Sequence, residues 1–145
     1  MKITLIQTSL IWEDAEANRQ NFLRLIQDVN DTDLIILPEM FSTGFTMAPE
    51  AVAEAMDGPT IAWMKKIAKD KNCAVTGSIV VKEGDNYYNR VLFVFPTSEI
   101  KTYNKHHLFS LAGENIAYTK GKERLIVEYK GWKICPLICY DLRFP

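Results

Sequence analysis

The stretch CAVTGSIVVKEGDNYYNRVLFVFP, residues 73–96, decides the fold class of this 145-residue chain. Two runs rich in valine, isoleucine, tyrosine and phenylalanine stand on either side of the sequence Gly-Asp-Asn at 84–86. β-branched and aromatic runs around a glycine-containing turn are typical of a β-hairpin. We therefore predict two paired strands that turn at these three residues.

The segments before this hairpin alternate between strand and helix patterns. Residues 2–8 (KITLIQT) and 33–40 (DLIILPEM) are short apolar runs that predict strands, the first of them buried and the second ended by Pro38. Residues 14–30 and 58–72 carry apolar side chains at helical spacing, so both are predicted to be amphipathic helices. Strands that alternate with helices indicate an α/β fold.

The segments after the hairpin predict further strands. Residues 99–105 (EIKTYNK) continue the strand pattern, and residues 124–140 predict a second hairpin that turns at Lys130-Gly131. The connector between them, residues 106–120, is longer than most loops in compact domains, and loops of this length are often functional. The complete order predicts an α/β protein with at least one mixed sheet.

Composition excludes several classes of function. The chain is 48% hydrophobic and 24% charged, with a formal net charge of −1, so no basic excess is present to neutralise nucleic-acid phosphates. Its apolar runs are far shorter than the roughly 20 residues of a membrane helix. Three cysteines without the spacing of a disulfide framework favour reduced thiols and a cytoplasmic location.

Three residues with complementary chemistry follow strand-like segments. Glu39 follows an apolar strand, Lys105 ends the segment 99–105, and Cys139 closes the apolar run PLIC at 136–139. Taken singly, these residues are also compatible with a surface or helix-capping acid, a solvated lysine and an inert core thiol. Taken together, a carboxylate, an ammonium and a thiol form the set of base, electrophilic stabiliser and nucleophile.

Metal binding is not expected. If residues 135–139 form a strand, Cys135 and Cys139 lie roughly 13 Å apart on one face, which is too far to share one ion. His106 and His107 are neighbours on an extended chain and are expected to point to opposite faces. The sequence therefore predicts no metal site.

Three motifs in the chain resemble those of the nitrilase, or carbon–nitrogen hydrolase, superfamily. They are ILPEMFSTGF (36–45), YNKHHLF (103–109) and PLICYDLRFP (136–145), in the order that the family uses. The details PEMFSTGF, AGEN and GWKICPLICYDLRFP are similar to the bacterial omega-amidase branch. That branch releases ammonia from the terminal amide of short 2-oxo dicarboxylic acid monoamides such as 2-oxoglutaramate.

The resemblance implies a role for each matched residue. Glu39 is expected to be the general base, Lys105 the cation that stabilises the tetrahedral oxyanion, and Cys139 the nucleophile that forms a thioester. Glu114, in AGEN, matches a second glutamate that orients the lysine, and the backbone N–H of Tyr140 completes the oxyanion hole. Beside the carboxylate and the ammonium, the thiolate form of the cysteine is expected to be favoured.

Substrate contacts are less specified by the sequence. Arg143 is a fixed positive charge near the cysteine that could pair with a substrate carboxylate, but an internal salt bridge with Asp141 is the alternative. Phe41, Phe45 and Met47 could form a wall of the pocket or belong to the packing.

Chain length is the departure from the family pattern. Family members are nearly twice as long and form a four-layer α-β-β-α sandwich, so residues 1–145 are expected to be a single domain truncated on its C-terminal side. A sheet without its partner sheet exposes an apolar face, which predicts a homo-oligomer, dimer or higher, or a complementary second polypeptide. The alternatives to an omega-amidase are another nitrilase-superfamily amidase or carbamoyl amidase, and a non-catalytic remnant or assembly subunit.

Overall fold

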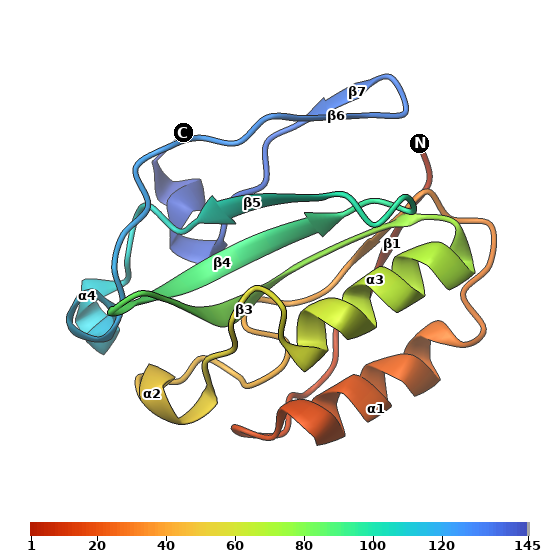
Figure 1. The fold of residues 1–145 in the computed structure, drawn as a ribbon. Coiled ribbons are helices and arrows are strands. Elements are labelled where there is room, and N and C mark those ends of the chain that lie inside the picture. Colours follow the sequence, from red (N-terminus) through yellow and green to blue (C-terminus); the bar gives the residue numbers. More distant parts are fainter. Residues whose placement is uncertain (145) are drawn as a thin grey trace.

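The computed structural model describes residues 1–144 as helices packed on one face of a five-stranded mixed sheet (Figure 1). The strands in spatial order are β1 (Ile3–Leu5), β2 (Leu34–Ile36), β3 (Ala74–Glu83), β4 (Asn86–Val94) and β5 (Ile100–Asn104). Strands β1, β2 and β3 are parallel, whereas β3, β4 and β5 are antiparallel. The predicted α/β class with a mixed sheet is confirmed.

The hairpin of β3 and β4 is the longest pairing in the sheet. Its register runs from Val75 opposite Val94 to Glu83 opposite Asn86, and Gly84 and Asp85 form the turn. Gly84 has a φ of +59°, in the left-handed region that glycine enters without steric cost. The sequence therefore placed both the hairpin and its turn correctly.

Two amphipathic helices cover one face of the sheet. They are α1 (Ala15–Ile26) and α3 (Pro59–Lys71), and they lie side by side in Figure 1, with the short α2 (Pro49–Val52) at the edge. Asp14 caps α1 by accepting a 2.9 Å hydrogen bond from the backbone N–H of Ala17. The main core lies between these helices and the sheet and includes Phe22, Ile26, Ile61, Met64, Val75, Ile79 and Leu92.

A second hairpin covers part of the opposite face. It consists of β6 (Val127–Tyr129) and β7 (Trp132–Ile134), and it turns at Lys130 and Gly131 as predicted (Figure 1). Its contact with the sheet is a small cluster of Leu34, Ala74, Phe93 and Val127.

The first strand is less buried than its sequence predicts. Ile3 and Leu5 pair with β2 residues that face the β6–β7 hairpin, yet their side chains are 46% and 73% exposed. The reason is that β1 is an edge strand and the hairpin does not reach it. The prediction of a buried strand was therefore wrong.

The residues before the cysteine also differ from the prediction. Strand β7 ends at Ile134, and residues 135–138 belong to no strand. Pro136 has no N–H to donate to a strand ladder. Cys139 instead begins the 3-10 helix η2 (Cys139–Arg143).

Two short helices lie within the connector that follows Lys105. They are the 3-10 helix η1 (Ser110–Ala112) and the single-turn α4 (Glu114–Ala117). Within residues 1–144, no helix has the length and apolar character needed to cross a membrane.

Candidate active site

Lys105 is the centre of a buried charge cluster at the end of β5. Its side chain is only 1% exposed, and its Nζ lies 2.8 Å from Glu39 Oε1 and 2.9 Å from Glu114 Oε2. Burial acts to lower the pKa of this ammonium, but hydrogen bonds to Glu39 and Glu114 hold the pKa above its ordinary value. Lys105 therefore remains a cation, which suits it to stabilise negative charge and not to act as a base.

A tight turn after β2 places Glu39 beside this lysine. The backbone N–H of Met40 donates to Ser78 Oγ at 2.9 Å, and that of Phe41 donates to the Ser78 carbonyl at 3.1 Å. Met40 has a φ of +45°, an uncommon conformation for a side chain of this size. The Glu39 side chain is 21% exposed, so it contacts Lys105 and also reaches the surface.

Glu114 is a fully buried carboxylate held by three kinds of donor. Besides Lys105, its oxygens accept from Asn89 Nδ2 at 3.1 Å and from the backbone N–H of Phe109 at 2.6 Å. A buried charge needs this degree of pairing to be tolerated. The expected neighbourhood of Glu114 and Lys105 is present.

Asn89 is a site residue that sequence reasoning missed. It is 1% exposed on β4, and its Nδ2 donates to Glu39 Oε1 at 2.8 Å as well as to Glu114. One amide group therefore bridges two carboxylates that share one ammonium. The available indication was a polar residue beside an apolar run in the strand YYNRVLFV.

Cys139 lies beside Glu39 at the start of η2, in a strained backbone conformation. Its φ is +43°, in the left-handed region that non-glycine residues rarely adopt. Burial raises the pKa of its thiol, and the charge of Glu39 and a hydrogen bond with that carboxylate raise it further, while Lys105 acts in the opposite direction. The net shift is upward, so the expectation of a favoured thiolate was wrong: at neutral pH the resting group is a thiol.

Tyr140 directly follows the cysteine within η2, so its backbone N–H belongs to the first turn of this helix. Its ring packs edge-on against Phe109 and Phe144, with centroids 5.1 Å and 5.3 Å away. The role of the N–H as an oxyanion donor stays a prediction.

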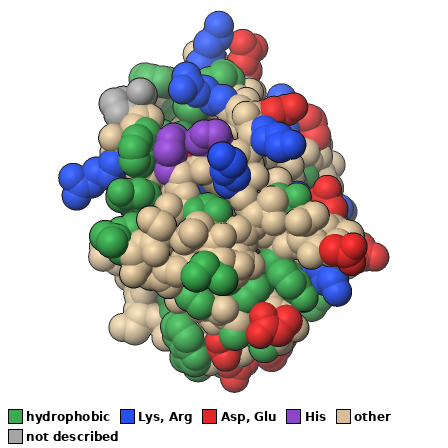
Figure 2. Space-filling view, turned by 90° about the vertical axis from the view of Figure 1, so that its left-hand side faces the viewer, with side chains coloured by type: hydrophobic (Ala, Val, Ile, Leu, Met, Phe, Trp, Pro, Cys, Tyr) green, Lys and Arg blue, Asp and Glu red, His purple; other side chains and the backbone are tan. Residues whose placement is uncertain are grey.

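The histidines take up structural positions. His106 Nδ1 lies 2.7 Å from the Gly121 carbonyl, and His107 Nδ1 lies 3.0 Å from Asp141 Oδ1. Their rings meet edge to face at 4.6 Å and both reach the surface, as Figure 2 shows, so the prediction of opposite faces was wrong. The cause is that β5 ends at Asn104, before the two histidines. Among residues 1–144, no group of three metal-ligating side chains is close enough to hold an ion.

Arg143 is exposed and lines a surface pocket together with Cys139, Phe109, Tyr140 and Phe144. The alternative salt bridge with Asp141 does not form. The Asp141 carboxylate is instead bonded to side chains and backbone elsewhere, including Tyr103 and His107.

The two expected aromatic wall residues have different positions. Phe41 does not line the site: it is fully buried in the main core, 5.5 Å from Phe22 and 5.9 Å from Trp63 between ring centroids. Phe45 is half-buried and lies at the site, with Lys105 Nζ 5.2 Å from its ring centroid. The two aromatic residues of this loop therefore belong to different places, Phe41 to the core and Phe45 to the site.

Comparison with known proteins gives the family. The sequence profile of carbon–nitrogen hydrolases matches residues 2–145. The chain belongs to the carbon–nitrogen hydrolase family. Its predicted resemblance is confirmed, and its structural neighbours lie in the nitrilase superfamily.

Individual relatives share much of the sequence. The omega-amidase YafV of Escherichia coli is 42% identical over all of this chain, and the 2-oxoglutaramate amidase of Bacillus subtilis is 36% identical over 78% of it. The solved structure of XC1258 from Xanthomonas campestris, a superfamily protein with an arsenic adduct in its active site, is 42% identical with a TM-score of 0.96 over 99% of this chain.

The chain spans about half the length of each of these three relatives. It covers 56% of the Escherichia coli omega-amidase, 45% of the Bacillus subtilis enzyme and 55% of XC1258.

Proposed function

We propose that this chain provides the catalytic residues of a thiol-dependent amidohydrolase that releases ammonia from the terminal amide of small 2-oxo dicarboxylic acid monoamides. One observation carries the proposal: the Glu39 carboxylate lies 2.8 Å from the Lys105 ammonium and lines the same pocket as Cys139. A base, a cation and a nucleophile within reach of one another are the parts that acyl transfer needs. The names of two relatives, an omega-amidase and a 2-oxoglutaramate amidase, support this substrate class.

In the first half of the proposed reaction, the thiol becomes a thioester. Cys139 Sγ attacks the amide carbon while Glu39 takes the thiol proton, so the thiolate is generated during attack. Lys105 and the backbone N–H of Tyr140 stabilise the resulting oxyanion. The carbon–nitrogen bond then breaks, and Glu39 returns the proton to the leaving nitrogen, which departs as ammonia.

In the second half, water completes hydrolysis. Glu39 removes a proton from water, and the hydroxide adds to the thioester carbon at the same oxyanion position. The carbon–sulfur bond breaks, the acid leaves, and Cys139 recovers its proton from Glu39. Glu114 and Asn89 hold Lys105 and Glu39 in place through the hydrogen bonds described above. No metal or organic cofactor enters this scheme. The proposed location is the cytoplasm, whose reducing conditions keep thiols free.

The carboxylate of the substrate is assigned to Arg143. This guanidinium lines the same surface pocket as Cys139, and a bidentate pair with a carboxylate gives both affinity and orientation. A neutral aliphatic amide lacks that contact. An acidic monoamide is therefore expected to be hydrolysed with a higher kcat/KM than a neutral amide of the same length.

Cys139→Ala tests the nucleophile. The variant is expected to reduce ammonia release from 2-oxoglutaramate to the uncatalysed rate, because the thioester cannot form. Cys135→Ala is the matched control: this exposed thiol lies four residues earlier and should be dispensable. Ammonia release that survives in Cys139→Ala would sink the proposal, and an inactive wild-type chain would favour a non-catalytic remnant or assembly subunit.

A substrate panel tests the class of amide. Preference for neutral amides or carbamoyl compounds over 2-oxoglutaramate, with Cys139 still essential, would indicate another superfamily amidase or a carbamoyl amidase.

A further inference from the structure

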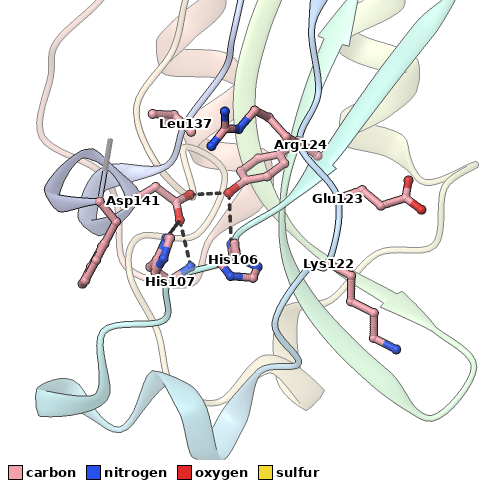
Figure 3. Close-up of a pocket in the computed structure, with 9 residues that line it drawn as sticks. His106, His107, Lys122, Glu123, Arg124, Leu137 and Asp141 are labelled. Carbon is pink, nitrogen blue, oxygen red and sulfur yellow. Dashed lines mark hydrogen bonds and ion pairs between the residues drawn. The ribbon is translucent and has the colours of Figure 1, made fainter.

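Asp141 is a buried carboxylate that the proposed reaction does not use. It is 1% exposed, although it lies two residues after the nucleophile. Its Oδ2 accepts from Tyr103 Oη at 2.8 Å and from the Ile138 N–H at 3.1 Å. Its Oδ1 lies 2.8 Å from the His107 N–H and 3.0 Å from His107 Nδ1 (Figure 3). Every contact of this carboxylate is thus with a segment adjoining a proposed catalytic residue.

These bonds join the segment of Cys139 to the segment of Lys105. Tyr103 precedes Lys105 by two residues on β5, and His107 follows it by two. Tyr103 Oη also accepts from the His106 N–H at 3.1 Å, so the phenol fixes the backbone on which the lysine turns inward. Asp141 therefore contacts residues on both sides of Lys105.

The same carboxylate closes a small ring around the nucleophile. The Asp141 N–H donates to the Ile138 carbonyl at 3.0 Å, while the Ile138 N–H donates back to the Asp141 side chain at 3.1 Å. Cys139 and Tyr140 lie inside this ring, and Cys139 has the φ of +43° noted above. A left-handed conformation at a residue with a side chain persists only where its surroundings hold it.

We propose that Asp141 is a positioning residue that acts through Tyr103 and His107 to hold the strained Cys139 turn against Glu39 and in register with Lys105. It touches neither substrate nor reacting atoms. The charge suits this role, because its hydrogen bonds hold the pKa of the Asp141 carboxyl below the ordinary value despite burial. An ionised acceptor bonds N–H and O–H donors more strongly than a neutral one does.

The test compares Asp141→Asn with Tyr103→Phe. The first keeps the side-chain shape but removes the charge. The second removes the bonds of Tyr103 Oη to Asp141 and to the His106 N–H without changing any charge at neutral pH. Asp31→Asn, at an exposed carboxylate that pairs with Lys2, is the control. The readout is the rate at which iodoacetamide alkylates Cys139 between pH 6 and about 10, measured on the Cys139 peptide by mass spectrometry.

We expect both variants to lower the apparent pKa of Cys139 toward that of an ordinary thiol. The pKa is raised in the native turn by burial and by Glu39, and a released turn loses both effects. Asp141→Asn is expected to give the larger shift and Asp31→Asn none. In ammonia release, kcat should fall by about 10²-fold for Asp141→Asn with KM unchanged, because a misplacement of about 1 Å at the reacting atoms has this effect.

The alkylation readout separates this inference from the proposed function, on which only the kcat prediction rests. If the Cys139 titration is unaltered in a folded Tyr103→Phe variant, the proposed positioning role of Asp141 is overturned, whether or not the chain releases ammonia. If thermal unfolding shows that Asp141→Asn is not folded, Tyr103→Phe alone decides. A loss of stability in both variants with no shift in the thiol pKa would make Asp141 a purely structural residue and also overturn the proposal.

Discussion

At the residue scale, one carboxylate has opposite effects on the charge of its two neighbours. Glu39 stabilises the ammonium form of Lys105 and disfavours the thiolate form of Cys139. The two effects have the same origin, since a negative charge raises the pKa of any neighbouring acid. The proposed reaction therefore begins from a neutral thiol beside a ready acceptor.

The first prediction at this scale concerns Glu39→Gln. Removal of the charge takes away a cause of the raised pKa of Cys139, while Lys105 still lowers it. Alkylation of Cys139 by iodoacetamide at neutral pH should therefore become faster. Ammonia release should fall by about 10²–10⁴-fold, because the proton acceptor is lost.

Glu99→Gln is the matched control for this experiment, since Glu99 is an exposed carboxylate in the turn before β5. The result that contradicts the prediction is a parallel fall of alkylation and ammonia release in Glu39→Gln, which would mean that Glu39 promotes the thiolate in the resting protein.

At the scale of elements, the connector after β5 returns to the backbone at Lys105, directly after the end of this strand. The Gly121 N–H donates to the Lys105 carbonyl at 2.8 Å, and the Gly121 carbonyl lies 2.7 Å from His106 Nδ1. A Cβ at Gly121 would stand 2.0 Å from the carbonyl oxygen of Asn104, which is backbone and cannot move aside alone. The close approach requires glycine.

Gly121→Ala should accordingly shift the Lys105 backbone. Overpacking of this kind costs about 1–3 kcal/mol, and a backbone contact places the change toward the upper end. The free energy of unfolding, measured with urea, should decrease by this amount, and ammonia release should fall with it. Gly84→Asn is the control, because no atom lies within 4 Å of a Cβ there and asparagine tolerates the left-handed turn. Equal stability of Gly121→Ala and Gly84→Asn would show that the connector is loosely attached.

At the scale of the whole molecule, large apolar side chains remain at the surface. Leu111, Ile116 and Leu142 are 88%, 87% and 75% exposed, and they lie in η1, α4 and η2. Figure 2 shows hydrophobic side chains on the face that carries these elements. Leu5 in the edge strand β1 and Trp132 in β7 are 73% and 57% exposed.

We propose that residues 1–145, produced alone, self-associate through these apolar surfaces. Exposed apolar area of this extent favours burial against another chain. Light scattering coupled to size-exclusion chromatography should give a mass of at least twice the 16.6 kDa of the chain. A monodisperse species of 16.6 kDa would contradict self-association.

Sequence by itself determined the elements of this protein and the residue types of its candidate site. The hairpin 73–96 with its glycine turn, the helices on either side of β2 and the three family motifs follow from local patterns, because each depends on neighbours close in the chain. Glu39 and Lys105 could be named from their positions at the ends of strand-like segments, whereas Glu114 was named only from the family resemblance.

Only the tertiary structure decided how these residues act on one another. The raised thiol pKa of Cys139 depends on Glu39, from a distant part of the chain. The bridging amide of Asn89 and the bond between Asp141 and Tyr103 join residues 25 to 50 positions apart. Phe41 and Phe45 show the same limit, since four residues of spacing in a loop do not specify which side chain enters the core. Whether residues 135–139 form a strand depends on whether another strand lies beside them, which an apolar run does not reveal. The sequence therefore predicted a strand where the chain forms a strained turn.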